Sequence, residues 1–146
     1  AGSVTVDRLP ELLALPGVVF LTHNSPVELL LDGAIPEHNV DTVWDLGFDG
    51  TGITVAIIDT GIDPDHPDLR NQLWVNPKEI AGNDTDDDGN GYKDDIHGYD
   101  FASNTGTLTD SGDHGTHVAG TIAAQGNNNL GIIGAYPQAK LLGLKL

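Results

Sequence analysis

The stretch VAIIDTGIDPDHPDL, residues 55 to 69, most constrains how this chain can fold. An apolar, β-branched run from Ile53 to Ile58 leads directly into Asp59. Such a run predicts a parallel strand that is covered on both faces, and Pro64 and Pro67 predict a loop after it. Sites in open parallel sheets form beyond the carboxyl ends of the strands. Asp59 therefore stands where a functional carboxylate is expected.

Three more segments have the patterns of regular structure. Val40 to Leu46 predicts a short helix, and His114 to Gln125 predicts a helix of small residues that can pack closely on a sheet. Ala139 to Leu146 predicts a second strand, whereas Asn71 to Thr109 is expected to consist of loops. The order strand, helix, strand indicates an α/β fold with a parallel sheet.

Charge and composition narrow the possible partners. The 146 residues include no Cys and no Met, so disulfides and thiolate metal sites are excluded. Six basic residues against 22 acidic ones give a net charge of −16, which disfavours nucleic acid and favours cations. No apolar run approaches the roughly 20 residues of a membrane span. Ala1 opens no signal-peptide pattern, so any targeting segment is expected to be missing from this sequence.

A carboxylate at the end of a buried strand needs a partner to offset its desolvation. His114 and His117 are the candidates, because they open the predicted helix beside the sheet. An aspartate that fixes the tautomer of an imidazole orients a base that activates a nucleophile. The helix N-terminus should also disfavour a protonated His114. On spacing alone, a turn aspartate with two core histidines fits equally well.

The block VAIIDTGID with HPDL, followed 55 residues after Asp59 by HGTHVAGT, resembles the subtilisin-like serine proteases, or subtilases. The resemblance covers about Ala34 to Leu146. It implies a partial subtilisin-like parallel sheet with flanking helices and a secreted endopeptidase that acts on polypeptides. By the same resemblance, Asp59 is the orienting carboxylate, His114 is the general base and His117 is a structural histidine.

Two further blocks of that family are absent from these residues. The nucleophile belongs to a Gly-Thr-Ser-Met/Leu-Ala block, and the oxyanion hole uses an Asn between His and Ser; neither occurs here. Ser111 stands in a polar loop three residues before His114 and is a poor nucleophile candidate; the other serines are Ser3, Ser25 and Ser103. The resemblance therefore implies the amino-terminal part of a protease, inactive alone, that needs the remainder of the catalytic domain.

Three alternatives stay open at this point. Asp59-Thr60-Gly61 is also the signature of retropepsin-like aspartic proteases, for which LGIIGAY at residues 130 to 136 would form a later strand of an all-β fold. His114 and His117 with an acidic third ligand could bind zinc. A calcium-binding or interaction module could also keep a protease scaffold without catalysis.

The acidic run NDTDDDGNGYKDD, residues 83 to 95, has the spacing of a calcium loop. Carboxylates fall at positions 1, 3, 5 and 12 around a glycine at position 6. The predicted Ca²⁺ ligands are Asp84, Asp86, Asp88 and Asp95, with Asn90 as a contributor and Asp94 as the substitute for Asp95. Position 8 is Gly91 and no amphipathic helices flank the run, so it is not an EF-hand. A solvated acidic turn is the alternative.

The resemblance adds two expectations. Subtilases of many bacteria insert a calcium loop between the Asp and His blocks, which this run resembles, and they build another calcium site from positions that correspond here to Asp68 and Asn128. Residues 1–33 resemble the closing half of an α+β inhibitory prodomain, whose end, Glu28 to Leu31, would lie in the active-site cleft. The expected domains are thus 1–33 and 34–146; an ordinary strand at Val27 to Leu31 is the alternative.

Overall fold

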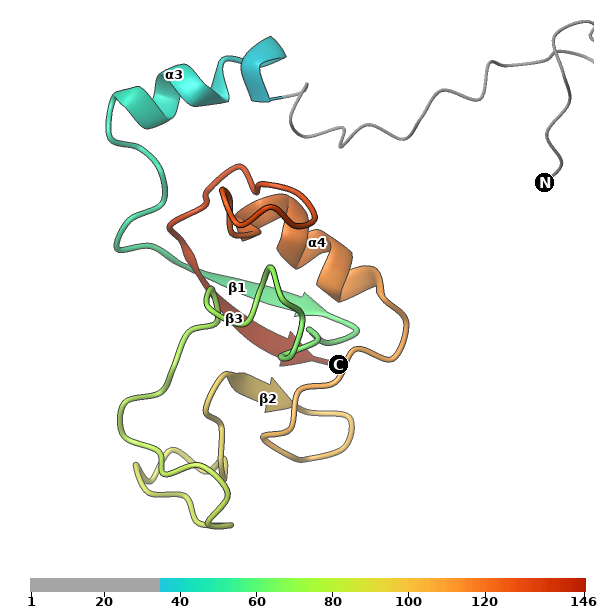
Figure 1. The fold of residues 1–146 in the computed structure, drawn as a ribbon. Helices are drawn as coiled ribbons and strands as arrows, with labels where there is room; N and C mark the ends of the chain where they lie inside the picture. Colours follow the sequence, from blue (N-terminus) through green and yellow to red (C-terminus); the bar gives the residue numbers. More distant parts are fainter. Residues whose placement is uncertain (1–34) are drawn as a thin grey trace, which may run out of the picture.

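The computed structural model describes residues 35–146, and the predictions for residues 1–33 lie outside the described residues. Figure 1 shows a parallel sheet with the strand order β1-β3-β2, in which α4 lies beside β1 and β3. The strands are β1 (Thr54–Asp59), β2 (Gly98–Asp100) and β3 (Lys140–Lys145), and the helices are α3 (Val40–Asp45) and α4 (His114–Ala123). The predicted α/β class with a parallel sheet is confirmed.

The strand that ends on Asp59 is parallel, as predicted, but it is covered on one face only among the described residues. Val55 and Ile57 pack in the core opposite Leu141 and Gly143 of β3. Ile58, on the other face, is 63% exposed. The prediction of cover on both faces is therefore wrong here, because α4 packs against one side of the sheet.

Small side chains let α4 lie close to the sheet. Four of its residues are buried: Gly115, Ala119, Gly120 and Ala123. The helix ends two residues earlier than predicted, since Ala124 leaves the helical region with ψ of 137° and is itself fully buried. The core around the helix consists of Ile57, Ile62, Leu69, Leu73, Ala119, Ala123, Ala124, Ala139 and Leu141.

The loop region contains one strand that the sequence pattern did not predict. β2 has only three residues, all buried, and pairs in parallel with the carboxyl-terminal half of β3. Residues 130 to 136, by contrast, form no strand; Ala135 and Tyr136 donate backbone hydrogen bonds to the carbonyls of Thr121 and Ile122 in α4. A parallel sheet with a helical crossover excludes the all-β aspartic-protease alternative.

Two glycines allow the turn after β1 and the start of α4 to touch. Gly61 has a positive φ of 118°, and a Cβ there would collide with the carbonyl oxygen of Thr109. A Cβ on Gly115 would collide with the carbonyl oxygen of Gly61 and would come within 3.3 Å of the Asp59 Cβ. The backbones are therefore in contact where the strand ends and the helix begins.

We predict opposite effects for alanine at the two buried glycines of α4. Gly115→Ala should lower the free energy of unfolding by about 1–3 kcal/mol, because the added methyl overpacks against a backbone carbonyl. Gly120→Ala is the matched control: its Cβ would meet only the Ile132 Cδ1, at 3.6 Å, so greater helix propensity should stabilise by up to about 1 kcal/mol. Urea unfolding of both variants measures the difference. Equal stability of the two variants would show that the close contact is not formed.

Candidate active site

The structure brings Asp59 and His114 together. His114 Nδ1 lies 2.8 and 2.9 Å from the two carboxylate oxygens of Asp59, and the backbone N–H of Thr60 donates to Asp59 Oδ1 at 2.7 Å. An ionised carboxylate only accepts, so Nδ1 carries the hydrogen that is donated. Nε2, on a side chain that is 69% exposed, is then left with a free lone pair. This is the geometry of an oriented base.

The pair shifts both pKa values. The hydrogen bond with His114, followed by that from the Thr60 N–H, lowers the pKa of Asp59 below its ordinary value. The same hydrogen bond and the negative charge of Asp59 raise the pKa of His114, and Asp110 adds a smaller Coulombic contribution. The expected effect of the helix N-terminus, which would disfavour a protonated His114, is thus outweighed by a neighbouring carboxylate.

Asp110, in the loop before α4, makes contacts that the sequence analysis did not predict. Its carboxylate accepts hydrogen bonds from the Thr60 hydroxyl and the Thr116 N–H, both at 2.7 Å, and from the Gly112 N–H at 3.1 Å. The Thr60 hydroxyl oxygen in turn accepts from the Gly115 N–H at 3.1 Å. Asp110 lies four residues before His114, a spacing that matches no motif considered above.

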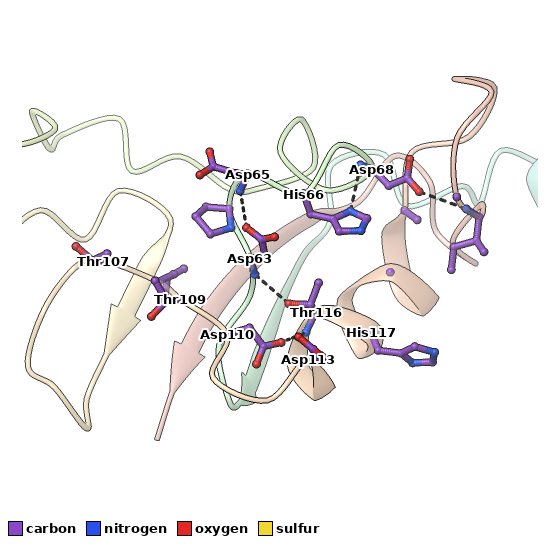
Figure 2. Close-up of a pocket in the computed structure, with 16 residues that line it drawn as sticks. Asp63, Asp65, His66, Asp68, Thr107, Thr109, Asp110, Asp113, Thr116 and His117 are labelled. Carbon is purple, nitrogen blue, oxygen red and sulfur yellow. Dashed lines mark hydrogen bonds between the residues drawn. The ribbon is translucent and has the colours of Figure 1, made fainter. Parts of the chain in front are cut away.

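A pocket of about 740 Å³ lies beside α4 (Figure 2). Asp63, Asp110 and Asp113 contribute carboxylates to its wall, and the exposed His117 contributes its imidazole. Neither Asp59 nor His114 lines it. His114 and His117 belong to no group of metal-ligand side chains in the described part of the chain, so the zinc alternative has no support there.

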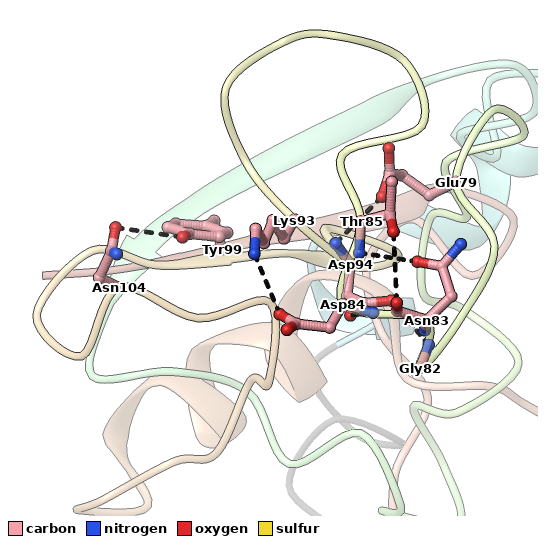
Figure 3. A network of polar contacts seen from close by, with 9 residues as sticks. All are labelled: Glu79, Gly82, Asn83, Asp84, Thr85, Lys93, Asp94, Tyr99 and Asn104. Carbon is pink, nitrogen blue, oxygen red and sulfur yellow. Dashed lines mark hydrogen bonds and ion pairs between the residues drawn. The ribbon is translucent and has the colours of Figure 1, made fainter.

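The acidic loop is held together by hydrogen bonds to its own backbone. Asp86 accepts from the N–H groups of Gly89, Asn90 and Gly91, and the bond from Gly91 is the largest cause of the lowered pKa of Asp86. Asp94 accepts from the N–H groups of Gly82, Asn83 and Asp84, as Figure 3 shows. Backbone donors therefore offset part of the repulsion between the carboxylates.

Among residues 35–146, one group of side chains could hold a metal ion: Glu79, Asp86 and Asp88 each offer an oxygen, all within 4.8 Å of one another. Two of the three were predicted as ligands. Glu79 was missed because it precedes the 12-residue spacing that defines the motif. Its Oε1 also accepts from the N–H groups of Asp87 and Asp88, so the loop folds around it.

The other predicted ligands lie near this group or apart from it. Asp95 accepts hydrogen bonds from the amides of Asn76 and Asn90, both at 2.9 Å, and Asn76 also donates to Asp88 at 3.2 Å. Asp84 points away: its side chain is 92% exposed and pairs with Lys93 at 3.3 Å (Figure 3). Metal binding by Asp84, Asn90 and Asp95 stays a prediction.

The second predicted calcium site appears as a hydrogen-bonded pair. Asn128 Nδ2 donates to the buried Asp68 carboxylate at 2.7 Å, and the Ile132 N–H donates to its other oxygen at 3.3 Å. The Asn128 amide oxygen accepts from the Leu130 N–H. The structure thus brings Asp68 and Asn128 together, with a nitrogen toward the carboxylate. Calcium binding there stays a prediction.

An imidazole oriented by a carboxylate, at the carboxyl end of a parallel α/β sheet, is the arrangement of hydrolases that activate a nucleophile. A comparison of the sequence with known protein families supports this assignment to the hydrolases. Residues 50–146, which include both side chains, match the Subtilase family (Peptidase_S8). The chain belongs to the subtilase family, and the match takes in the amino-terminal part of the family's domain.

Three relatives are similar in sequence to this chain over 60% to 96% of its length. Subtilisin-like protease 1 of Plasmodium berghei (strain Anka) is 46% identical over 89 residues, which cover 60% of this chain and 15% of the relative. Minor extracellular protease Vpr of Bacillus subtilis (strain 168) is 34% identical over an alignment of 166 residues, gaps included, which covers 96% of this chain and 18% of the relative. The crystal structure of fervidolysin from Fervidobacterium pennivorans, a keratinolytic enzyme related to subtilisin, has a TM-score of 0.48 at 34% identity, covering 71% of this chain and 13% of that chain. The matched part of the chain thus spans between 13% and 27% of the length of these and other curated relatives.

We predict that His114 titrates above its ordinary pKa of 6.5, and that Asp59→Asn lowers the pKa of His114. The stability that His114 contributes is fully present below pH 6.5 and is lost as the pH rises through the raised pKa. The contribution of Asp59 is present above pH 3.8 and is lost as the pH falls through the lowered pKa. NMR titration of the imidazole measures the first value directly. Titration of His114 below 6.5 in the unmodified protein would contradict the ion pair.

Proposed function

We propose that this chain supplies two members of the catalytic triad of a serine endopeptidase, Asp59 and His114, and that the serine lies outside these 146 residues. The observation that carries the proposal is the hydrogen bond between the Asp59 carboxylate and His114 Nδ1. It forms within the segment that matches the subtilase family. Polypeptides are the proposed substrates, as for proteases of this family.

The chemistry follows from the orientation of the imidazole. With Nδ1–H held by Asp59, Nε2 accepts the proton from the serine hydroxyl as its oxygen attacks the peptide carbonyl carbon. The imidazolium that forms is stabilised by the carboxylate, which itself stays ionised. His114 then gives that proton to the leaving amine, and the acyl-enzyme is hydrolysed by water with the same base. The raised pKa of His114 favours the imidazolium formed during each step.

We predict that Asp59→Asn in the full-length protein lowers kcat by about 10⁴-fold while the protein still folds, because the imidazole loses the partner that fixes its tautomer. Hydrolysis of a peptide ester measures kcat, and circular dichroism verifies folding. The unmodified 146-residue chain is the negative control and should not react with a fluorophosphonate probe, because it lacks the nucleophile block. Unchanged ester hydrolysis would refute the assigned role, and a folded full-length protein without turnover would favour the non-catalytic module.

We also propose that the acidic loop binds Ca²⁺. The hard oxygens of Asp86 and Asp88 converge with that of Glu79, which is the ligand type that Ca²⁺ prefers. Asp95 is joined to the same cluster through Asn76. When bound, the ion supplies positive charge among like-charged carboxylates, and the loop residues would hold it. No catalytic step depends on it.

We predict that Ca²⁺ raises the melting temperature relative to chelator, because a ligand that binds only the folded form stabilises it by mass action. Replacing both Asp86 and Asp88 with alanine should reduce the shift to whatever the predicted site at Asp68 and Asn128 contributes. The matched control removes two exposed carboxylates elsewhere, Glu37 and Asp45, and should keep the full shift. An absent shift in the unmodified protein, or the same shift in both double variants, would rule out this loop as the stabilising site.

A secreted zymogen is the proposed form of the whole protein. The Bacillus relative is named as an extracellular protease, and its alignment spans 96% of this chain, so it includes most of residues 1–33. Among the described residues, no helix has the length and apolar character needed to cross a membrane. We propose that residues 1–33 are the end of an inhibitory prodomain, with Glu28 to Leu31 as a strand that adds to the substrate-binding edge.

We predict that the active full-length enzyme is cleaved within one or two residues of Leu31. Amino-terminal sequencing of the mature enzyme should find a start at Asp32, Gly33 or Ala34. The active-site variant Asp59→Asn is the control and should stay uncleaved if processing is autocatalytic. A mature enzyme that begins well before Pro26 would contradict the prodomain and would favour an ordinary strand at Val27 to Leu31.

A further inference from the structure

Asp110 is the most strongly engaged side chain near the site that the catalytic mechanism leaves without a role. Its two oxygens accept three hydrogen bonds, from the loop before α4, from the first turn of α4 and from the turn after β1. It therefore joins the three segments that meet at the site. Figure 2 shows Asp110 beside Thr116 at the start of the helix.

The charge of Asp110 decides which way the Thr60 hydroxyl points. An ionised carboxylate has no hydrogen to donate, so the contact of 2.7 Å between the two side chains requires the Thr60 O–H to donate. A lone pair of the same oxygen is then free to accept from the Gly115 N–H, at 3.1 Å. A neutral amide at position 110 would place its nitrogen either against the Thr116 N–H or against the Gly112 N–H, which shares Oδ1 with the Thr60 hydroxyl, so either arrangement brings two donors face to face.

Thr60 and Gly115 are the residues that directly follow Asp59 and His114 in the chain. The Thr60 N–H donates to the Asp59 carboxylate, while its hydroxyl binds the backbone next to His114. The hydrogen bonds that run from Asp110 through Thr60 thus involve the Asp59 carboxylate and the backbone next to His114. They fix the backbone on each side of the hydrogen bond that orients the imidazole.

We propose that Asp110 is a positioning residue for the Asp59–His114 pair, acting through the Thr60 hydroxyl and the first turn of α4. The inference rests on the proposed protease function. Hydrogen bonds from Thr116, Thr60 and Gly112 keep Asp110 ionised, since together they outweigh burial and hold its pKa well below the usual range. Asp110 therefore acts as a permanent acceptor at every pH at which the histidine works as a base.

Asp113 provides a control for the loss of a carboxylate next to His114 in the chain. It immediately precedes His114 and its side chain makes no capping hydrogen bond, so Asp113→Asn removes one negative charge near the imidazole and leaves the network intact. Thr60→Val removes the bridging hydroxyl while keeping the shape of the side chain. Comparison of these variants with Asp110→Asn separates positioning from electrostatics.

The experiment measures kcat and KM of the full-length enzyme per active site, with sites titrated by a fluorophosphonate. Asp110→Asn should lower kcat by about 10- to 100-fold, as expected when supporting hydrogen bonds are lost, and should change KM by less than about twofold. Asp113→Asn should stay within about twofold of the unmodified enzyme. The double variant Asp110→Asn plus Thr60→Val should lose no more than the worse single variant, because residues that act as a unit are not additive.

If Asp110 only stabilised the fold, a different result would be expected. Asp110→Asn would then lower the number of titratable sites but leave kcat per site unchanged, and this result would overturn the proposal. An equal loss of kcat in Asp113→Asn, or fully additive losses in the double variant, would also overturn it.

A readout independent of turnover separates this proposal from the protease function. Asp59 of β1 and Asp110 of the loop before α4 are the carboxylates whose charges act on His114, while Asp113 directly precedes it in the chain and His117 lies one turn along the helix. In a full-length protein without peptidase activity, the protease proposal fails, and NMR titration of His114 still tests the network. Thr60→Val keeps the charge of Asp110, so a lower pKa of His114 in Thr60→Val supports positioning; a pKa lowered in Asp110→Asn but unchanged in Thr60→Val is explained by the Coulombic contribution of Asp110 and overturns it.

Discussion

The backbone contact between the turn after β1 and the first turn of α4 sets the position of every group at the site. Side chains alternate along a strand, so Asp59 points to the same side as Val55 and Ile57, which is the side that α4 covers. Glycine at position 115 lets the helix come close enough for a direct hydrogen bond between strand end and helix start. The buried alanines of α4 keep that short distance along the rest of the helix.

Local patterns predicted the parts of the site that depend on local structure. The apolar run before Asp59 and the small residues after His114 define a strand and a helix, and the order of elements then brings their ends together. Asp110 could not be found in this way, because its partners Thr60 and Thr116 are set by tertiary contact and no periodicity or spacing marks it. β2 was missed for a similar reason: three residues are too few to show an alternating pattern, and it exists because β3 offers a free edge.

In the acidic loop, too, the spacing of residues predicted some of the candidate metal ligands, whereas others depend on tertiary structure. The spacing predicted Asp86 and Asp88, which converge, but it could not predict Glu79 from outside the motif or the outward direction of Asp84. Aromatic packing further ties the loop to the sheet, since Tyr92 of the loop packs at a tilt of 55° against Tyr99 of β2, with ring centroids 4.7 Å apart. Asp100, at the end of the same strand, pairs with Lys145 of β3 at 3.3 Å. The packing of the acidic loop on β2 and the ion pair between β2 and β3 therefore stabilise the loop and this edge of the sheet together.

The strand order places β1 at an edge of the described sheet, where Ile58 is 63% exposed beside backbone groups that pair with β3 on one side only. An exposed apolar edge strand is a template for pairing with another chain, and therefore a source of aggregation when it is not covered. The net charge of −16 acts in the opposite direction, because strongly like-charged molecules repel one another at low salt. Solubility of this 146-residue chain should consequently depend on ionic strength: added salt screens the repulsion but leaves the apolar edge unchanged.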